Sequence, residues 1–460
     1  MKRFAPIIDD HASWDATETA TRIRSGEVSA LEVVEAAVRR AEAAGALAAI
    51  VTPTYDQARS AAGRIGGPFA GVPMFVKDLA NLAGVRTGFG TRAITDFVPT
   101  ESDPFIELVM GTGLVSLGKS SAPEFGLTGT TEPLGAEPTR NPWDLDRSVG
   151  GSSGGSAALV AAGIVPIATA SDGGGSIRIP AAATGTVGLK PSRGRFPDPL
   201  GDALPLNILT SGVVTRTVRD QVAFYAAIEP SVRSPRLPAI GPVEPLERPL
   251  RVALSVDNPV CAPHPDVRAA FDRTAHLLER LGHAVEPIPP LAEDRFVDEF
   301  LDYWGYLAFL IRWTSKFTID RRFDGRLLEP WTRSLARRFA RRLPRFGRTL
   351  RSLRAFESLY EERLQGFDVV MTPVTATPPP PIGHLAPDQP FDVHLARVSE
   401  FVPYTPAWNV SGAPAIALPL EWSDDGLPIG IHFGARLGEE ALLLSLGLQL
   451  EAAVGGFRRL

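Results

Sequence analysis

The sequence predicts an α/β fold. Short apolar runs typical of buried strands alternate with stretches whose apolar residues recur at helical spacing, and this alternation occurs in both terminal parts of the chain. The chain has 460 residues, 44% of them hydrophobic, and can therefore bury a large core. This order of elements is typical of a sheet that helices cover.

The N-terminal part is expected to begin with helical structure. Ser29 and Glu32 have the spacing of a capping box, and Val34, Ala37 and Ala41 then follow at helical spacing. The elements expected after this helix are the apolar runs LAAIVTP and GVPMFVKD, a helix over DPFIELVMGTG, and the apolar run LVSLGKS.

A proline-rich connector interrupts the alternation. Six prolines lie within residues 230–249, which predicts an extended segment. After it, the pattern LRVALSV predicts a buried strand and PDVRAAFDRTAHLLERLG predicts a helix. The C-terminal part returns to strand patterns, PAIALPLEW and LPIGIHFGA, and ends with a helix over 439–453.

We expect one domain over 1–460. Its core is expected to comprise 1–228 and 366–460, with 229–365 as a variable α/β and helical region that shapes the substrate pocket. Within that region, residues 312–354 carry fourteen basic residues against three acidic ones. Solvated helices with basic outer faces are the favoured interpretation, and attachment to an anionic membrane surface or an acidic partner is the alternative.

Composition limits the partners. A formal net charge of -5 gives no reason to expect nucleic acid, which demands an excess of Lys and Arg. Cys261 is the single cysteine, so an intrachain disulfide is impossible and a reducing compartment fits best. The N-terminus carries no apolar leader, and we expect a cytoplasmic protein. The sequence leaves a homodimer open.

Two glycine-rich patches carry the serines Ser152 and Ser176, twenty-four residues apart. Such patches can cradle phosphates, but neither contains the lysine of a P-loop nor the spacing of a dinucleotide-binding loop. The pattern G-x-S-x-G of a serine-hydrolase elbow fits Ser152 and Ser153, although a polar segment broken by proline precedes it where a buried strand is required. The late histidines available to such a triad are His384, His394 and His432.

Lysine is the other candidate base. The chain has 42 arginines and only 5 lysines, and lysine, unlike arginine, can lose its proton when it is desolvated. Lys77 lies at the end of the apolar run GVPMFVKD, which is expected to carry it inward. The alternative is a buried structural lysine paired with Asp78.

The motifs GVPMFVKD, TRNPWDLDRSVGGSSGGSAA, SDGGGSIRIPAAATGTVGLKPSRGR and AWNVSGAPAIALPLEWSDDGLPIGIHFGA together resemble the amidase signature family of amide hydrolases. The resemblance spans about 15–454 and is weakest over about 230–367. It is greatest to the branch that contains 6-aminohexanoate-cyclic-dimer hydrolase. It implies the amidase-signature fold, a central mixed β-sheet covered by helices on both faces.

The resemblance also implies a Ser-cis-Ser-Lys triad. Ser176 would be the nucleophile, Ser152 the bridging serine after a cis Gly151–Ser152 peptide, and Lys77 the base. The backbone N–H groups of the second glycine patch would form an oxyanion hole. Its members would be Gly173, Gly174, Gly175 and Ser176, with Asp172 and Arg178 bracing the loop. The family usually has a side chain at the position of Gly173, so we expect a more flexible loop here.

The function expected from this resemblance is hydrolysis of a small-molecule amide through an acyl-enzyme, without a metal or cofactor. The alternatives are the glutaminase subunit of a tRNA-dependent amidotransferase, a Ser-His-Asp ester hydrolase built on Ser153, and a mere binding site. The acyl pocket is expected to draw on the poorly matched region. Tyr303, Trp304 and Tyr306 are candidates there, with an ordinary core role as the alternative.

Overall fold

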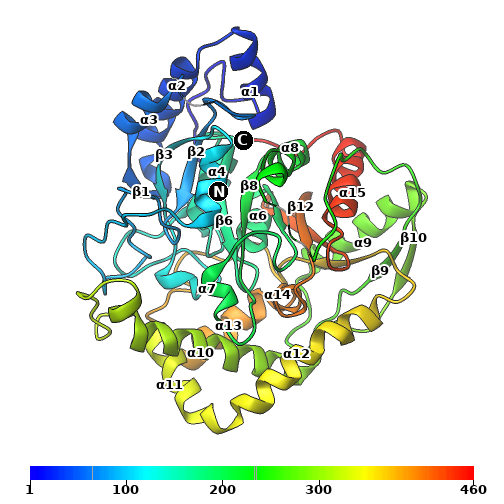
Figure 1. Ribbon diagram of the computed structural model, residues 1–460. Coiled ribbons are helices and arrows are strands. Elements are labelled where there is room, and N and C mark those ends of the chain that lie inside the picture. Colours follow the sequence, from blue (N-terminus) through cyan, green and yellow to red (C-terminus); the bar gives the residue numbers. More distant parts are fainter. Residues whose placement is uncertain (65, 233, 235) are drawn as a thin grey trace.

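A computed structural model describes residues 1–64, 66–232, 234 and 236–460, and its centre is a mixed sheet (Figure 1). The eleven strands follow the order β1-β3-β2-β6-β8-β7-β12-β13-β11-β9-β10. Their bounds are β1 Ile50–Pro53, β2 Pro73–Lys77, β3 Val115–Ser120, β6 Ile167–Asp172, β7 Val187–Lys190, β8 Thr210–Thr215, β9 Arg251–Leu254, β10 Ala284–Pro287, β11 Val369–Pro373, β12 Ala415–Trp422 and β13 Pro428–Gly434. The pairs β2–β3, β2–β6, β9–β10 and β9–β11 are parallel, and the other pairs are antiparallel.

Helices surround this sheet in Figure 1. They are α1 Ala16–Ser25, α2 Ala30–Ala43, α3 Tyr55–Ala61, α4 Pro104–Gly111, α5 Gly154–Ala161, α6 Arg178–Thr184, α7 Pro199–Asp202, α8 Val218–Ile228, α9 Pro265–Arg280, α10 Asp294–Thr318, α11 Pro330–Arg342, α12 Phe346–Arg363, α13 Phe391–Phe401, α14 Pro406–Ser411 and α15 Glu440–Ala453. The predicted capping box is present at the start of α2, where Ser29 and Glu32 satisfy each other's backbone N–H groups.

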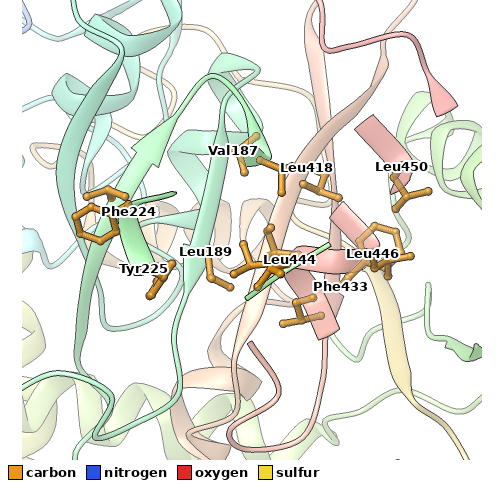
Figure 2. Close-up of a cluster of buried hydrophobic side chains, with 14 of the residues drawn as sticks. Val187, Leu189, Phe224, Tyr225, Leu418, Phe433, Leu444, Leu446 and Leu450 are labelled. Carbon is orange, nitrogen blue, oxygen red and sulfur yellow. The ribbon is translucent and has the colours of Figure 1, made fainter. Parts of the chain in front are cut away.

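Both faces of the sheet are buried. Successive residues of a strand point to opposite faces, and in β2 Met74 and Val76 belong to one hydrophobic cluster whereas Phe75 belongs to another. Figure 2 shows part of the first cluster, where Leu444 and Leu450 of α15 lie beside Leu418 of β12. The predicted mixed sheet with helices on both faces is therefore confirmed.

The sheet brings two chemically important strand ends together. β2 and β6 are parallel neighbours, with Met74 opposite Ile167 and Phe75 opposite Ala168. The carboxyl ends of parallel neighbours meet at the same edge of a sheet. Lys77, the last residue of β2, therefore lies beside the end of β6 and the glycine-rich loop that follows it.

The middle of the chain contributes to the same sheet. β9 and β10 extend it beyond β11, and the long helices α10, α11 and α12 pack together along one side of the molecule (Figure 1). The close approach of α10 and α11 depends on Gly305, where a Cβ would lie 2.9 Å from the Leu335 carbonyl oxygen. None of the helices that the structure describes combines the length and the apolar character needed to cross a bilayer.

Two segments refine the expectations from sequence. The polar segment before the first glycine patch, which is broken by proline, forms a small hairpin of β4 Arg140–Asn141 and β5 Asp144–Ser148. The central residues of β5 are partly solvent-accessible, which explains the polar sequence. The proline-rich connector opens with a short 3-10 turn, Glu229–Ser231, and its other described residues up to 249 lie outside helices and strands. Residues 233 and 235 of this connector lie outside the described part of the chain.

Candidate active site

Lys77 is buried at the carboxyl end of β2. Its Nζ donates to the Ser152 Oγ at 2.8 Å and to the Ser171 Oγ at 2.9 Å, and lies 3.3 Å from the Ser171 carbonyl oxygen. Burial lowers the pKa of Lys77 from 10.5 to about 7, and the Asp172 carboxylate opposes this shift. A large fraction of this amine is therefore unprotonated at neutral pH.

Ser152 lies in the first glycine-rich loop, between β5 and α5, and the Gly151–Ser152 peptide bond is cis. The family resemblance implies this isomer. The loop is tightly enclosed, since a Cβ at Gly151 would lie 2.5 Å from the Thr130 carbonyl oxygen. A Cβ at Gly126 would lie 3.0 Å from the Ser152 Oγ, so a side chain at position 126 would crowd this hydroxyl.

Ser176 lies in the second glycine-rich loop, between β6 and α6. The Ser153 N–H donates to the Ser176 carbonyl oxygen at 3.2 Å, and this bond joins the two loops. Ser176 is 6% exposed and lines an apolar pocket. The structure thus brings the three predicted triad residues into one region, with Lys77 and Ser152 in direct contact and Ser176 joined through its backbone.

Asp172 holds the second loop in shape. Its carboxylate accepts from the backbone N–H groups of Gly175 at 2.7 Å and Ile177 at 3.1 Å. It also accepts two bonds from the Arg178 guanidinium, each 2.9 Å, and both side chains are fully buried. Although burial alone would raise the pKa of Asp172, Arg178 holds it well below its usual range. These contacts support the prediction that Asp172 and Arg178 brace the loop.

The hydrogen bond from the Gly175 N–H to the Asp172 carboxylate removes one donor from the predicted oxyanion hole. This N–H already has an acceptor, so it is not free to bind an anionic oxygen. Gly175 has φ of +123°, and a Cβ there would lie 2.2 Å from the Thr405 Oγ1, so this glycine shapes the turn. The candidate donors that remain are the N–H groups of Gly173, Gly174 and Ser176.

Sequence reasoning missed three polar partners of this loop. Asn409 donates to Asp172 Oδ1 at 2.9 Å and accepts from Arg178 at 2.7 Å. His432 Nε2 lies 3.1 Å from Arg178, and because arginine only donates, this nitrogen accepts and the Nδ1 of His432 carries the proton toward Thr372. Ser171, the second partner of Lys77, directly precedes Asp172. Asn409 lies in a motif quoted for the resemblance, but it is 231 residues from Arg178, and no local pattern joins them.

Two rival interpretations do not fit this geometry. Asp78 lies 3.3 Å from Lys119 rather than in a pair with Lys77, so the geometry does not favour the alternative of a structural Lys77–Asp78 pair. The Ser153 hydroxyl donates to the Ser171 carbonyl oxygen at 3.3 Å. His432, one of the late histidines available to a Ser-His-Asp triad, is instead bound to Arg178 as described above.

The pocket beside Ser176 is formed by several distant segments. Its lining residues are Leu127, Thr128, Gly129, Gly174, Ser176, Ile179, Val260, Phe296, Val297, Phe300, Leu301, Trp304, Trp331, Leu395, Val398, Ser399, Val402, Pro403 and Pro406. Trp304 is thus a pocket residue, as expected. Tyr303 is buried and bonded to Leu206, and Tyr306 packs against Phe339, so these two take the alternative core role.

The more flexible loop expected at Gly173 stays a prediction, and the structure shows what surrounds this glycine. A Cβ there would lie 2.9 Å from Leu209 Cδ2 and 3.4 Å from the Trp304 ring. Side chains from neighbouring segments therefore fill the space that a side chain at this position would use. The glycine is part of the packing of the loop rather than a gap in it.

Comparison with known proteins identifies the family to which this chain belongs. The family model Amidase matches residues 32–444. The chain is 44% identical to the putative amidase AmiC of Mycobacterium tuberculosis, covering 98% of this chain and 97% of that protein. It is 34% identical to 6-aminohexanoate-cyclic-dimer hydrolase of Pseudomonas sp. (strain NK87), covering 96% and 94%. A solved structure of 6-aminohexanoate cyclic dimer hydrolase with its substrate matches with TM-score 0.90 and 31% identity, over 98% of this chain and 99% of that one.

These matches define an amide hydrolase with a mixed α/β fold. The chain belongs to the amidase signature family, and an amide is its substrate.

Proposed function

We propose that the chain hydrolyses a carboxylic amide through an acyl-enzyme on Ser176, with Lys77 as base and Ser152 as proton relay. The observation that carries the proposal is the 2.8 Å hydrogen bond between the buried Lys77 amine and the Ser152 hydroxyl. A free serine is a weak nucleophile and needs an adjacent base. A hydroxyl both accepts and donates a proton, so Ser152 can link Ser176 to the amine.

In the first half-reaction the Ser176 oxygen attacks the carbonyl carbon. Its proton passes to Ser152 as the Ser152 proton passes to the unprotonated Lys77. The N–H groups of Gly173, Gly174 and Ser176 stabilise the oxyanion, and losing one such donor typically costs about 10²–10³ in rate. The C–N bond then breaks, and the proton returns through Ser152 to the departing amine.

In the second half-reaction water takes the place of the amine. Lys77 and Ser152 remove a proton from water as it attacks the acyl carbon, and the ester bond to Ser176 breaks. The Ser176 oxygen recovers a proton through the same relay. The cycle returns every group to its starting protonation state, so the protein needs no co-reactant beyond water.

The glutaminase alternative fits the pocket poorly. Free glutamine carries an ammonium and a carboxylate, and both need charged or strongly polar partners when they are buried. No charged side chain lines the pocket among the residues that the structure describes. Activity of the purified chain on simple amides, without any partner protein, would distinguish an amidase from an amidotransferase subunit.

The test of the mechanism is covalent labelling. A fluorophosphonate probe, followed by peptide mass spectrometry, is expected to modify Ser176 in the wild type and to leave Ser176→Ala unmodified. Ser153→Ala is the matched variant, and it should still be labelled at Ser176. Label on Ser152 or Ser153, or amide hydrolysis by Ser176→Ala, would assign the nucleophile elsewhere.

A further inference from the structure

We propose that the pocket beside Ser176 selects the acyl part of an uncharged, apolar amide, and that Trp304 ties the fit of this group to the geometry of the oxyanion loop. The substrate class rests on the proposed acyl-enzyme at Ser176, because the pocket opens on that residue. Its walls come from α10, α13, the segment 127–129 and Trp331 of α11. Among the described residues, no charged side chain lines them.

Most polar atoms in these walls already have partners. The indole N–H groups of Trp304 and Trp331 both donate to the Leu127 carbonyl oxygen, at 2.9 and 2.8 Å. The Thr128 hydroxyl lies 3.3 Å from the Nε2 of His394. A charged acyl group would therefore give up its hydration without gaining an ionic partner, which is costly. An apolar chain gains from burial against the same walls.

The imidazole of His394, which lies behind the pocket wall, does not bring a positive charge to the pocket. His394 is buried and its ring stacks on Trp331 with centroids 4.3 Å apart. The groups that face it are the Thr128 hydroxyl, the Trp331 ring and the Arg397 guanidinium. Burial, with a contribution from Arg397, lowers the pKa of His394 to about 4, so the ring is neutral at neutral pH.

Trp304 lines the pocket and lies next to the oxyanion loop. The nearest atoms to a Cβ at Gly173 belong to Leu209, at 2.9 Å, and to the Trp304 ring, at 3.4 Å. A Cβ at Gly174 would lie 3.2 Å from Phe300. Phe300 and Trp304 are one helical turn apart on α10 and stack with centroids 5.5 Å apart. These rings therefore support the backbone whose N–H groups are the candidate oxyanion donors, and they form a wall of the pocket.

The first experiment compares three p-nitroanilides that share a leaving group. Their acyl groups are hexanoyl, 6-aminohexanoyl and 5-carboxypentanoyl, which are neutral, cationic and anionic. We expect kcat/KM for the neutral anilide to exceed that for each charged anilide by about 100-fold. Equal or higher values for either charged anilide would overturn the substrate class. The cyclic dimer of 6-aminohexanoate is uncharged and should be preferred to the linear dimer, which carries both charges.

Labelling by the fluorophosphonate probe distinguishes failure of the substrate class from failure of the proposed function. If Ser176 is labelled and the anilides are cleaved without preference for the neutral acyl group, the proposed function stands and the substrate class fails. If Ser176 is not labelled and no anilide is cleaved, the proposed function fails and the substrate class fails with it.

The second experiment tests Trp304 with Trp304→Phe. We expect kcat to fall about tenfold on both acetyl and hexanoyl anilides, because the oxyanion loop loses its support, and the preference for hexanoyl over acetyl to fall as well. Trp313→Phe is the matched control, on the same helix but 59% exposed, and should change neither value. A Trp304→Phe enzyme with unchanged kcat and unchanged preference would refute the coupling, and circular dichroism would verify that it is folded.

Discussion

The surroundings of Ser176 are polar on one side and apolar on the other. On one side, Lys77, Ser152 and Asp172 are polar, buried and held by hydrogen bonds to side chains and backbone. On the other side, the walls from α10 and α13 are almost entirely apolar. If Lys77 and Ser152 act as proposed, proton transfer and acyl selection belong to different parts of the chain. Strand ends and glycine-rich loops hold the first, and helices form the second.

Among substitutions on the polar side, those of Lys77 are expected to have the largest effect on activity. Lys77→Ala should lower kcat/KM on amides by about 10²–10⁴, the usual contribution of a general base. Lys77→Arg should be nearly as inactive, because arginine keeps its proton. Steady-state kinetics on an anilide measures both. Activity in Lys77→Arg above about a tenth of wild type, a barrier difference of about 1.4 kcal/mol, would make Lys77 a structural residue.

Lys190 supplies the matched control. It is also buried, and burial together with Arg178 lowers its pKa to about 7. Its Nζ donates to the Pro191 carbonyl oxygen at 2.8 Å. Lys190→Met should therefore retain amide turnover within tenfold of wild type, whereas Lys77→Met should not. The pair separates a lysine in contact with Ser152 from a lysine that is only buried.

Asp172→Asn removes the carboxylate that holds the second glycine-rich loop and leaves the Lys77 and Ser152 side chains in place. It leaves the buried Arg178 guanidinium without its anionic partner, which typically costs about 3–5 kcal/mol of folding stability. Urea unfolding measures this loss. The pKa of Asp172 is lowered by folding, so its contribution is present above the ordinary aspartate pKa and is lost only as pH falls toward its folded value. The carboxylate's own contribution is therefore complete by pH 5. Because Asp172 also raises the pKa values of Lys77 and Lys190, the destabilisation should be largest at pH 5–6, where both amines are protonated, and smaller above pH 8. A destabilisation that grows with pH would contradict this account.

The polar side of the site could be predicted from the sequence much better than the apolar side. Lys77, Ser152 and Ser176 occur in short motifs because glycine loops and strand ends impose local constraints on neighbouring residues. The pocket has no such motif, since Leu127, Trp304, Trp331 and Val398 are far apart in sequence and are ordinary core residue types. Trp304 could be named only as one aromatic among three, and the long-range bonds of Asn409 could not be named at all.

The pH dependence sharpens the role of Lys77 in catalysis. The base must be unprotonated, and its pKa is about 7, so kcat/KM should rise about tenfold per pH unit below pH 6 and level off above pH 8. Lys190→Met should keep this limb with its midpoint unchanged. If the limb moves in Lys190→Met, or is absent from the wild type, the ionisation that limits catalysis belongs to another group.

The same two lysines predict how folding stability varies with pH. Both have a folded pKa of about 7 against an ordinary value of 10.5, so between these values the unfolded chain binds more protons. The free energy of unfolding therefore rises with pH across this window, because the cost of burying two charged amines is fully present below pH 7 and is lost as pH approaches 10.5. Lys190→Met should reduce that slope in urea titrations from pH 7 to 10. A slope unchanged from wild type would mean that Lys190 is protonated in the folded protein.

The smallest effect is expected at the far end of α10, where the helix leaves the pocket. Phe300 and Trp304 line the pocket, whereas Trp313 and Phe317 are 59% and 85% exposed and belong to the basic segment 312–354. Part of that positive charge is already paired, as Arg338 and Arg342 bind Asp298 and Asp302. If the segment is a solvated face, the protein should not co-sediment with phosphatidylserine vesicles at physiological salt. Co-sedimentation that disappears at high salt, and is weakened by Phe317→Ser, would make this end of α10 a membrane-attachment surface.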